Sequence, residues 1–266
     1  MTRPPAHRLV IVVRADPVIC GHSGEARNLA EATLDRGYDD VRIPSWPIER
    51  LQETGLLLKP LDRVLLYFPG IVVERPEPVV DHKAPDGCYL AGFTSRLVEL
   101  FTDGVPTVCM SLYLSPHAVA VADAVRVAHS TGPPVNVVTV AEAVGSDVTN
   151  VVRSYLEENR WGAVALMLSS YLAHDVCLAV SDFTRDLILA EAAELDAAPR
   201  SPSGARVGLP WPTRRSTSGP SCSWTRARAT SWTRAGATGC SRDGARIATA
   251  TCSSCHGWTR PRGSTT

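Results

Sequence analysis

Short apolar segments with the composition of buried strands alternate with helical patterns from the start of the chain to about residue 198. Arg8–Val13 is typical, because a continuous β-branched run favours a strand buried on both faces of a parallel sheet. Repeated strand–helix units predict a doubly wound, Rossmann-like parallel α/β domain over residues 1–198. Residues 71–86, which include three prolines, are expected to form a surface excursion. The expected strands are 8–13, 40–43, 63–68, 106–112, 135–140 and 176–180, and the expected helices are 24–36, 90–101, 116–129, 147–158, 161–173 and 182–197.

The composition changes near residue 200. The whole chain has 27 basic and 27 acidic side chains, but residues 201–266 hold ten arginines and a single acidic residue, Asp243. From the Ile, Leu, Val, Met and Phe set, this segment has only Val207, Leu209 and Ile247. Too little apolar surface is present to offset the entropy of ordering the chain. We therefore expect an acidic domain at 1–198 followed by a disordered basic tail at 199–266.

A glycine-containing segment, Cys20–Glu25, follows the first expected strand and precedes the first expected helix. α/β sheets bind phosphate at this place, so Gly21, Ser23 and Gly24 are candidate ligand-binding residues. The alternative is a tight turn in which Ser23 caps the helix. The segment lacks the G-x-G-x-x-G pattern of nicotinamide enzymes, and Glu25 occupies the position where a nucleophile elbow needs its second glycine.

A second candidate cluster, Glu142–Asp147, follows a buried strand and opens a helix. It lies at the carboxyl edge of the expected sheet, where such folds bind ligands. Glu142 and Asp147 are candidate catalytic carboxylates, and Gly145 and Ser146 are candidate substrate contacts. The alternative is that Ser146 or Asp147 caps the helix while Glu142 is a solvated loop acid. His117, near a helix start, is expected to be structural.

Several of these segments resemble the N-terminal domain of family 4 GT-B glycosyltransferases. The sequence GEARNLA at 24–30, before Gly37, is similar to the first helix of that family. VVTV at 137–140, followed by Gly145–Asp147, is similar to its strand and "G-x-D" loop. VCLAVSDFTRDL at 176–187 resembles the most characteristic motif, and the likeness extends over about residues 8–196. Histidines common in the family are missing, because Ser111 and Ala141 or Glu142 stand near those places.

The resemblance implies retaining transfer of a sugar from a nucleotide-diphosphate donor to a hydroxyl acceptor. It implies that this domain receives the acceptor, while Gly21, Ser23 and Gly24 face the donor diphosphate. By the same resemblance Glu142, Gly145, Ser146 and Asp147 lie near sugar or acceptor, and Arg185 is a further candidate contact. The alternative from a different class is a stand-alone α/β module that binds a nucleotide or small molecule without catalysis.

The family's second, donor-binding domain has no counterpart after Pro199. Read in a shifted frame, permitted codons for Thr251–Thr266 allow a segment containing S-R-L-D-E-A-K-G, which resembles the missing donor site. At the same offset, Pro210–Arg226 allows a segment resembling the linker between the domains. We therefore expect a truncated enzyme with an out-of-frame tail and little or no transferase activity; sequencing of the gene tests the frameshift.

No apolar run near the start is long enough for a signal peptide or a membrane span, so a cytoplasmic protein with reduced thiols is expected. Peripheral membrane contact and oligomeric state are left open. No metal or other cofactor is expected: Cys252–His256 fits the C-x-x-C-H haem motif and tail cysteines resemble zinc ligands, but a shifted frame generates such strings freely. Non-specific binding of RNA or DNA to the basic tail would be an accidental property of a disordered segment, and no specific nucleic-acid partner is expected.

Overall fold

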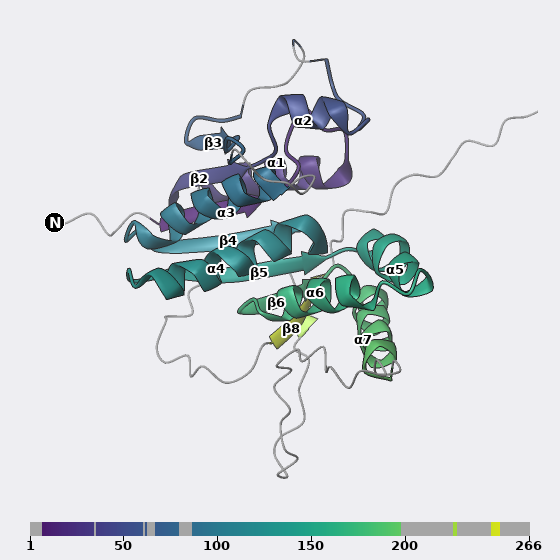
Figure 1. Ribbon diagram of the computed structural model, residues 1–266. Coiled ribbons are helices and arrows are strands. Elements are labelled where there is room, and N and C mark those ends of the chain that lie inside the picture. Colours follow the sequence, from purple (N-terminus) through teal and green to yellow (C-terminus); the bar gives the residue numbers. More distant parts are fainter. Residues whose placement is uncertain are drawn as a thin grey trace, which may run out of the picture.

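The computed structural model describes residues 7–34, 36–60, 62, 67–79, 87–197, 226–227 and 246–250. Its centre is a sheet in the order β3-β2-β1-β4-β5-β6-β8-β7 with every pairing parallel, so the predicted doubly wound α/β architecture is confirmed. The strands are β1 (His7–Val12), β2 (Tyr38–Pro44), β3 (Ile71–Glu74), β4 (Thr107–Leu112), β5 (Val137–Ala143), β6 (Val176–Ala179), β7 (Arg226–Ala227) and β8 (Arg246–Ala250) (Figure 1).

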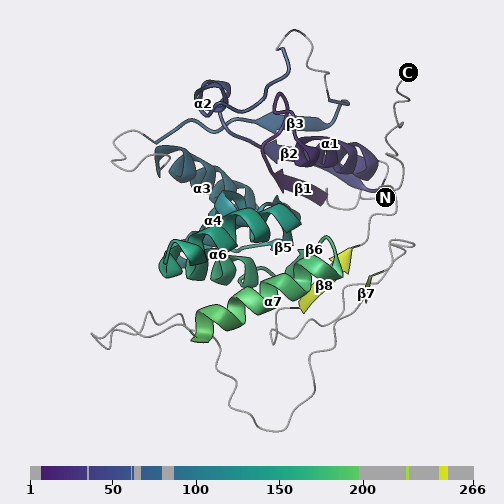
Figure 2. The ribbon, with the colours of Figure 1, turned by 90° about the vertical axis from the view of Figure 1, so that its right-hand side faces the viewer.

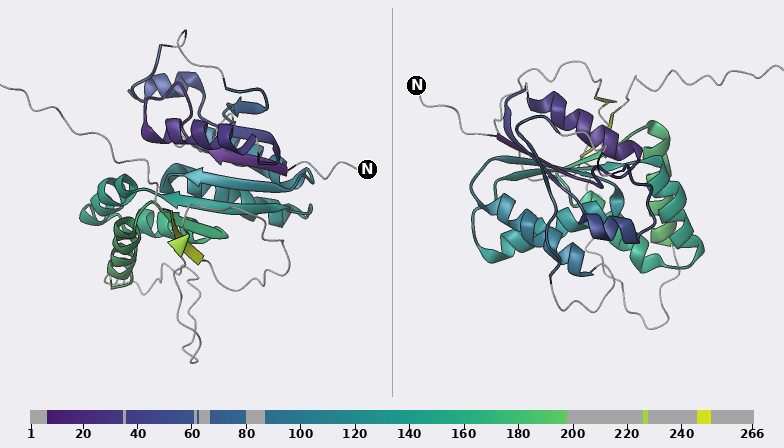
Figure 3. Two further views of the ribbon diagram at one scale, coloured as in Figure 1. Left: turned by 180° about the vertical axis from the view of Figure 1, so that it is seen from behind. Right: turned by 90° about the horizontal axis from the view of Figure 1, so that it is seen from above.

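Helices cover both faces of this sheet. Helix α1 lies on one face, and α3, α4 and α6 lie on the other, as Figures 2 and 3 show from two directions. The helices are α1 (Gly21–Leu34), α2 (Ile48–Glu53), α3 (Gly87–Thr102), α4 (Val119–Thr131), α5 (Arg153–Glu157), α6 (Trp161–Leu172) and α7 (Asp182–Ala197), with π-helical turns η2 (Leu114–Ala118) and η3 (Asp147–Val152).

The continuous apolar sequence of β1 fits a strand that is buried on both faces of the sheet. Successive side chains of a strand point to opposite faces. Val10 and Val12 pack with Phe93 of α3, whereas Ile11 packs with Ala26 of α1. All three strand residues are fully buried, which is why this run contains no polar position.

Two local predictions are wrong, and a third falls mostly on residues outside the described ones. Ile71–Glu74 is the edge strand β3 rather than a surface excursion, because the prolines follow the strand and end it instead of interrupting it. Helix α1 begins at Gly21, so the glycine segment forms the first turn of the helix rather than a loop before it. Residues 63–66 of the strand expected at 63–68 lie outside the described residues, and Tyr67 and Phe68 belong to no strand.

The tail is described only at β7 and β8. β8 pairs with β6 in parallel, from Val176 opposite Arg246 to Ala179 opposite Thr249, and so extends the sheet. The rest of 199–266, including the Cys252–His256 motif, lies outside the described residues. The predictions of disorder and of an out-of-frame origin therefore remain predictions there.

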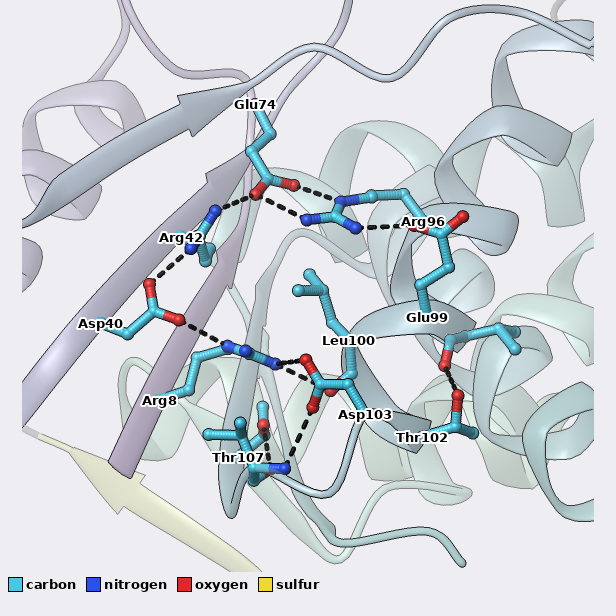
Figure 4. Close-up of polar contacts among 12 residues, drawn as sticks. Arg8, Asp40, Arg42, Glu74, Arg96, Glu99, Leu100, Thr102, Asp103 and Thr107 are labelled. Atoms are coloured by element: carbon cyan, nitrogen blue, oxygen red, sulfur yellow. Dashed lines mark hydrogen bonds and ion pairs between the residues drawn. The ribbon is translucent and has the colours of Figure 1, made fainter. Parts of the chain in front are cut away.

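A chain of ion pairs ties the first three strands to α3 (Figure 4). The buried Arg8 guanidinium lies 2.8 Å from Asp40 of β2 and 2.8 Å from Asp103 after α3. Glu74 of β3 accepts from Arg42 of β2 at 2.8 Å and from Arg96 of α3 at 2.7 Å. The edge strand β3 is thus held by charge as well as by its ladder with β2. Among the described helices, none combines the length and apolarity needed to cross a bilayer.

Candidate functional site

Of the predicted site residues, Glu142 and Asp147 lie together with side chains of other loops at the carboxyl edge of the sheet. Here the chain leaves β1 towards α1, leaves β4 towards η2, and leaves β5 towards η3. Because parallel strands end at the same edge, the two clusters predicted from sequence face one region. The side chains that gather there are Arg14, His22, Tyr113, His117, Glu142 and Asp147, as their stacking and electrostatic interactions show.

Glu142 is buried near the end of β5, between Leu112 of β4 and Leu178 of β6 in the ladder. It is only 5% exposed, and its Oε2 has no hydrogen-bond partner among the described residues. Burial, followed by the negative charges of Glu25 and Asp147, raises the pKa of Glu142 to about 7. At neutral pH this carboxyl can therefore either give or take a proton.

Asp147 is equally buried, but its carboxylate has partners. Its Oδ2 accepts a hydrogen bond from the backbone N–H of Leu114 at 3.1 Å, which links the turn after β5 to the turn after β4. Burial raises the pKa of Asp147 to about 6, although backbone hydrogen bonds and the charge of Arg14 oppose the rise. The two carboxylates are therefore unlike: Asp147 joins two loops, and Glu142 keeps an oxygen free.

Tyr113 stands between these loops. Its ring lies 4.0 Å from the ring of His22 and 5.6 Å from that of His117, centroid to centroid, and the Arg14 guanidinium lies 5.8 Å from it. Its backbone has φ 100°, a conformation rarely adopted by residues other than glycine. Burial raises the pKa of Tyr113 to about 12, so its hydroxyl stays protonated at neutral pH.

One ring nitrogen of His117, Nδ1, has the structural role predicted for this residue. Nδ1 lies 2.7 Å from the carbonyl oxygen of Leu112, so this nitrogen carries the proton. Burial lowers the pKa of His117 to about 4, which keeps the ring neutral. Nε2 is then an acceptor, and it has no partner among the described residues.

The three candidate residues at the start of α1 differ in their exposure. A Cβ on Gly21 or Gly24 would meet no atom within 4 Å, so both glycines leave exposed, open surface on the first turn. Ser23, in contrast, is 1% exposed, and its Oγ lies 3.4 Å from Asp16 Oδ1. The hydroxyl of Ser23 is therefore committed to a contact within the chain.

Asp16 anchors this region from the loop after β1. Its buried carboxylate accepts from Lys59 at 2.6 Å and from Arg27 of α1 at 2.5 Å, while Arg75 donates to its backbone oxygen. Burial raises the pKa of Asp16, but the hydrogen bonds from Lys59 and Arg27 outweigh it and hold the pKa below its ordinary value. This network fixes the loop that carries Arg14.

The remaining predicted residues lie at the next strand end and on α7. Gly145 lies close to Thr184, because a Cβ on Gly145 would come within 3.8 Å of its Oγ1; Ser146 is exposed. Arg185 pairs with its helix neighbours Asp182 at 2.8 Å and Asp186 at 2.7 Å. The structure thus places Arg185 in a surface ion-pair cluster of α7.

Sequence reasoning missed Arg14, Asp16 and Tyr113. A charged residue directly after a buried strand was the available signal for Arg14 and Asp16. Nothing in the local sequence marks the positive φ of Tyr113. Within the described residues no group of three or more His, Cys, Asp or Glu side chains could hold a metal ion.

No protein-family profile and no curated protein matches the chain. Among solved structures, it is similar to a chain described as a UDP-N-acetylglucosamine 2-epimerase from Listeria monocytogenes, with 12% identity and a TM-score of 0.39 over 70% of this chain and 42% of that one. A second UDP-N-acetylglucosamine 2-epimerase gives 15% identity and a TM-score of 0.38 over 70% of this chain and 45% of the other. The chain therefore spans less than half the length of either structure, and TM-scores this low do not identify its activity.

Proposed function

We propose that the carboxyl edge binds a nucleotide-diphosphate sugar and that the chain is the acceptor-side half of a retaining glycosyltransferase of family 4 type. The motifs at 24–30, 137–147 and 176–187 support this family. In the first turn of α1 the N–H groups of Ser23 and Gly24 donate to Cys20, so the amides offered to the diphosphate are those of Gly21 and His22, and Arg14 adds positive charge beside them.

The observation that carries the proposal is the free oxygen of buried Glu142. A buried carboxyl oxygen without a partner costs stability, so an unpaired one at a ligand-binding edge points to a partner that arrives with the ligand. A sugar presents several hydroxyls, each of which donates to a carboxylate or accepts from a protonated carboxyl. Glu142, with Gly145 and Ser146 beside it in the chain, would hold the sugar or the hydroxyl acceptor.

In this proposal the chain binds a nucleotide sugar but transfers its sugar poorly or not at all. Transfer of a sugar requires a group that neutralises the departing diphosphate, which the family's second domain provides. The described residues supply only one side of that cleft. We therefore expect the purified 266-residue chain to bind nucleotide sugars weakly and to have little or no transferase activity.

Isothermal titration calorimetry of the full chain with UDP-glucose, UDP-N-acetylglucosamine and GDP-mannose tests the proposal. Wild-type protein should bind at least one of them, and Glu142→Gln should weaken that binding about tenfold, since a lost hydrogen bond to a charged group is worth ~1.5 kcal/mol or more. Glu194→Gln, on the exposed side of α7, is the matched control and should leave binding unchanged. Absence of binding to all three ligands would refute the proposal.

A second candidate function is proton transfer at a carbon of the bound sugar, as in an epimerisation. The pKa of Glu142, at about 7, favours it, because a base that titrates near the working pH is suited to proton abstraction. Incubation with UDP-N-acetylglucosamine in D₂O separates the two: deuterium in the recovered sugar supports proton transfer, and its absence with intact binding leaves the glycosyltransferase half.

The stand-alone binding module remains the alternative from a different class. It requires tight nucleotide binding by residues 1–198 without any second domain. Limited proteolysis that removes the tail, followed by the same calorimetry, distinguishes it: a module keeps micromolar affinity, whereas half of a two-domain cleft binds weakly.

A further inference from the structure

The peptide between Tyr113 and Leu114 is held at both ends. The carbonyl oxygen of Tyr113 accepts from the N–H of Ala118 at 3.2 Å, which closes the first turn of η2. The N–H of Leu114 donates to Asp147 Oδ2 at 3.1 Å. The orientation of this one peptide therefore decides whether the turn after β4 reaches the carboxylate after β5.

That orientation depends on an unfavourable backbone at Tyr113. A φ of 100° with ψ of 138° crowds the Cβ of any residue except glycine, so the turn persists only if its surroundings enforce it. Packing of the Tyr113 ring can stabilise this backbone conformation, because the ring lies between His22 of α1, His117 of η2 and the Arg14 side chain. Backbone strain and aromatic packing thus meet at one residue of the site.

From this geometry we infer that Tyr113 is a positioning residue: its packed ring holds the strained turn that delivers the Leu114 amide to Asp147, leaving Glu142 as the free carboxyl for the ligand. The inference rests on the proposed function for the role of Glu142, but the contact from Leu114 to Asp147 is testable without any ligand. Charged groups that face Asp147 are Arg14 and Glu142, and Tyr113 faces it as a neutral phenol.

Three substitutions separate the ring from the backbone. Tyr113→Phe keeps the ring and should behave as wild type. Tyr113→Ala removes the ring but keeps a Cβ, so the turn should relax to a negative φ and the Leu114 amide should leave Asp147. Tyr113→Gly also removes the ring but tolerates a positive φ, so it should retain part of the contact that the alanine variant loses.

The first readout is the titration of the Asp147 carboxyl by ¹³C NMR in the full chain. The Leu114 hydrogen bond lowers the pKa of Asp147, so its loss in Tyr113→Ala should raise that pKa, by up to about 1 pH unit, above its value in Tyr113→Gly, which loses the same ring and therefore the same burial of Asp147. Tyr113→Phe should leave the pKa of Asp147 at its wild-type value. Asn159→Ala is the matched control, since Asn159 is exposed with φ 57° in the turn between α5 and α6.

The second readout is affinity for the nucleotide sugar that wild type binds. Tyr113→Ala should bind at least tenfold more weakly, with Tyr113→Gly intermediate. An Asp147 pKa equal in Tyr113→Gly and Tyr113→Ala would overturn the inference, as would equal losses of affinity in the phenylalanine and alanine variants. If wild type binds no nucleotide sugar while the Asp147 titration shifts as expected, the proposed function fails and the positioning role of Tyr113 stands.

Discussion

Replacement of Glu142 by glutamine should make the domain increasingly stable relative to wild type as the pH rises. The folded protein holds the pKa of this carboxyl at about 7, against an ordinary value of 4.5. Ionisation is therefore opposed in the folded state and free in the unfolded state, so the native chain loses stability as pH rises from 4.5 to 7. With 1.36 kcal/mol for each pH unit, the raised pKa of Glu142 lowers the free energy of unfolding by about 3 kcal/mol at pH 8 and by about 1 kcal/mol at pH 5.

The glutamine variant removes this pH-dependent cost. Any penalty from its buried amide is the same at both pH values, so the stability difference between Glu142→Gln and wild type should grow by about 2 kcal/mol from pH 5 to pH 8. Urea unfolding followed by circular dichroism at the two pH values measures it, with Glu194→Gln as the exposed control. A stability difference that does not change with pH would refute the burial of Glu142 as an unpaired carboxyl.

Three further predictions concern contacts that stabilise the domain. Arg8→Met should lower the free energy of unfolding, measured by urea denaturation, by about 2 kcal/mol, because it removes the buried guanidinium that contacts Asp40, Asp103 and the Leu100 carbonyl, although Asp40 keeps its pair with Arg42. Arg126→Met at an exposed pair should change it by less than about 1 kcal/mol. Asp16→Asn should cost about 2 kcal/mol at pH 7; since the folded pKa of Asp16 is lowered, that difference should shrink as the pH falls below 3.8, and a constant difference would contradict it. Ser181→Ala removes the hydroxyl that accepts from the Thr184 amide at 3.1 Å at the start of α7, so it should cost about 1 kcal/mol in thermal unfolding; a neutral result would mean that this cap is not needed.

The sequence alone was sufficient where one local signal dominated. Helix α7 was expected at 182–197 and occupies those residues, because its start and its apolar period are both written locally. The buried strands β1 and β4 were recognised for the same reason, since a strand covered on both faces needs a continuous apolar run. The edge strand β3 was missed because it has four residues, one partner strand and a polar end that is satisfied only by Arg42 and Arg96.

For the site, the sequence determined which residue types lie at the carboxyl edge, since parallel strands must all end there. Only the tertiary structure decided what each of them can do. Glu142 and Asp147 look alike in sequence, yet one keeps a free oxygen and the other is bound by the Leu114 amide from another strand end. Ser23 looked like a ligand contact, but its hydroxyl faces Asp16. Hydrogen-bond partners and burial come from residues distant in the chain, and these set the charge and the availability of every group in the site.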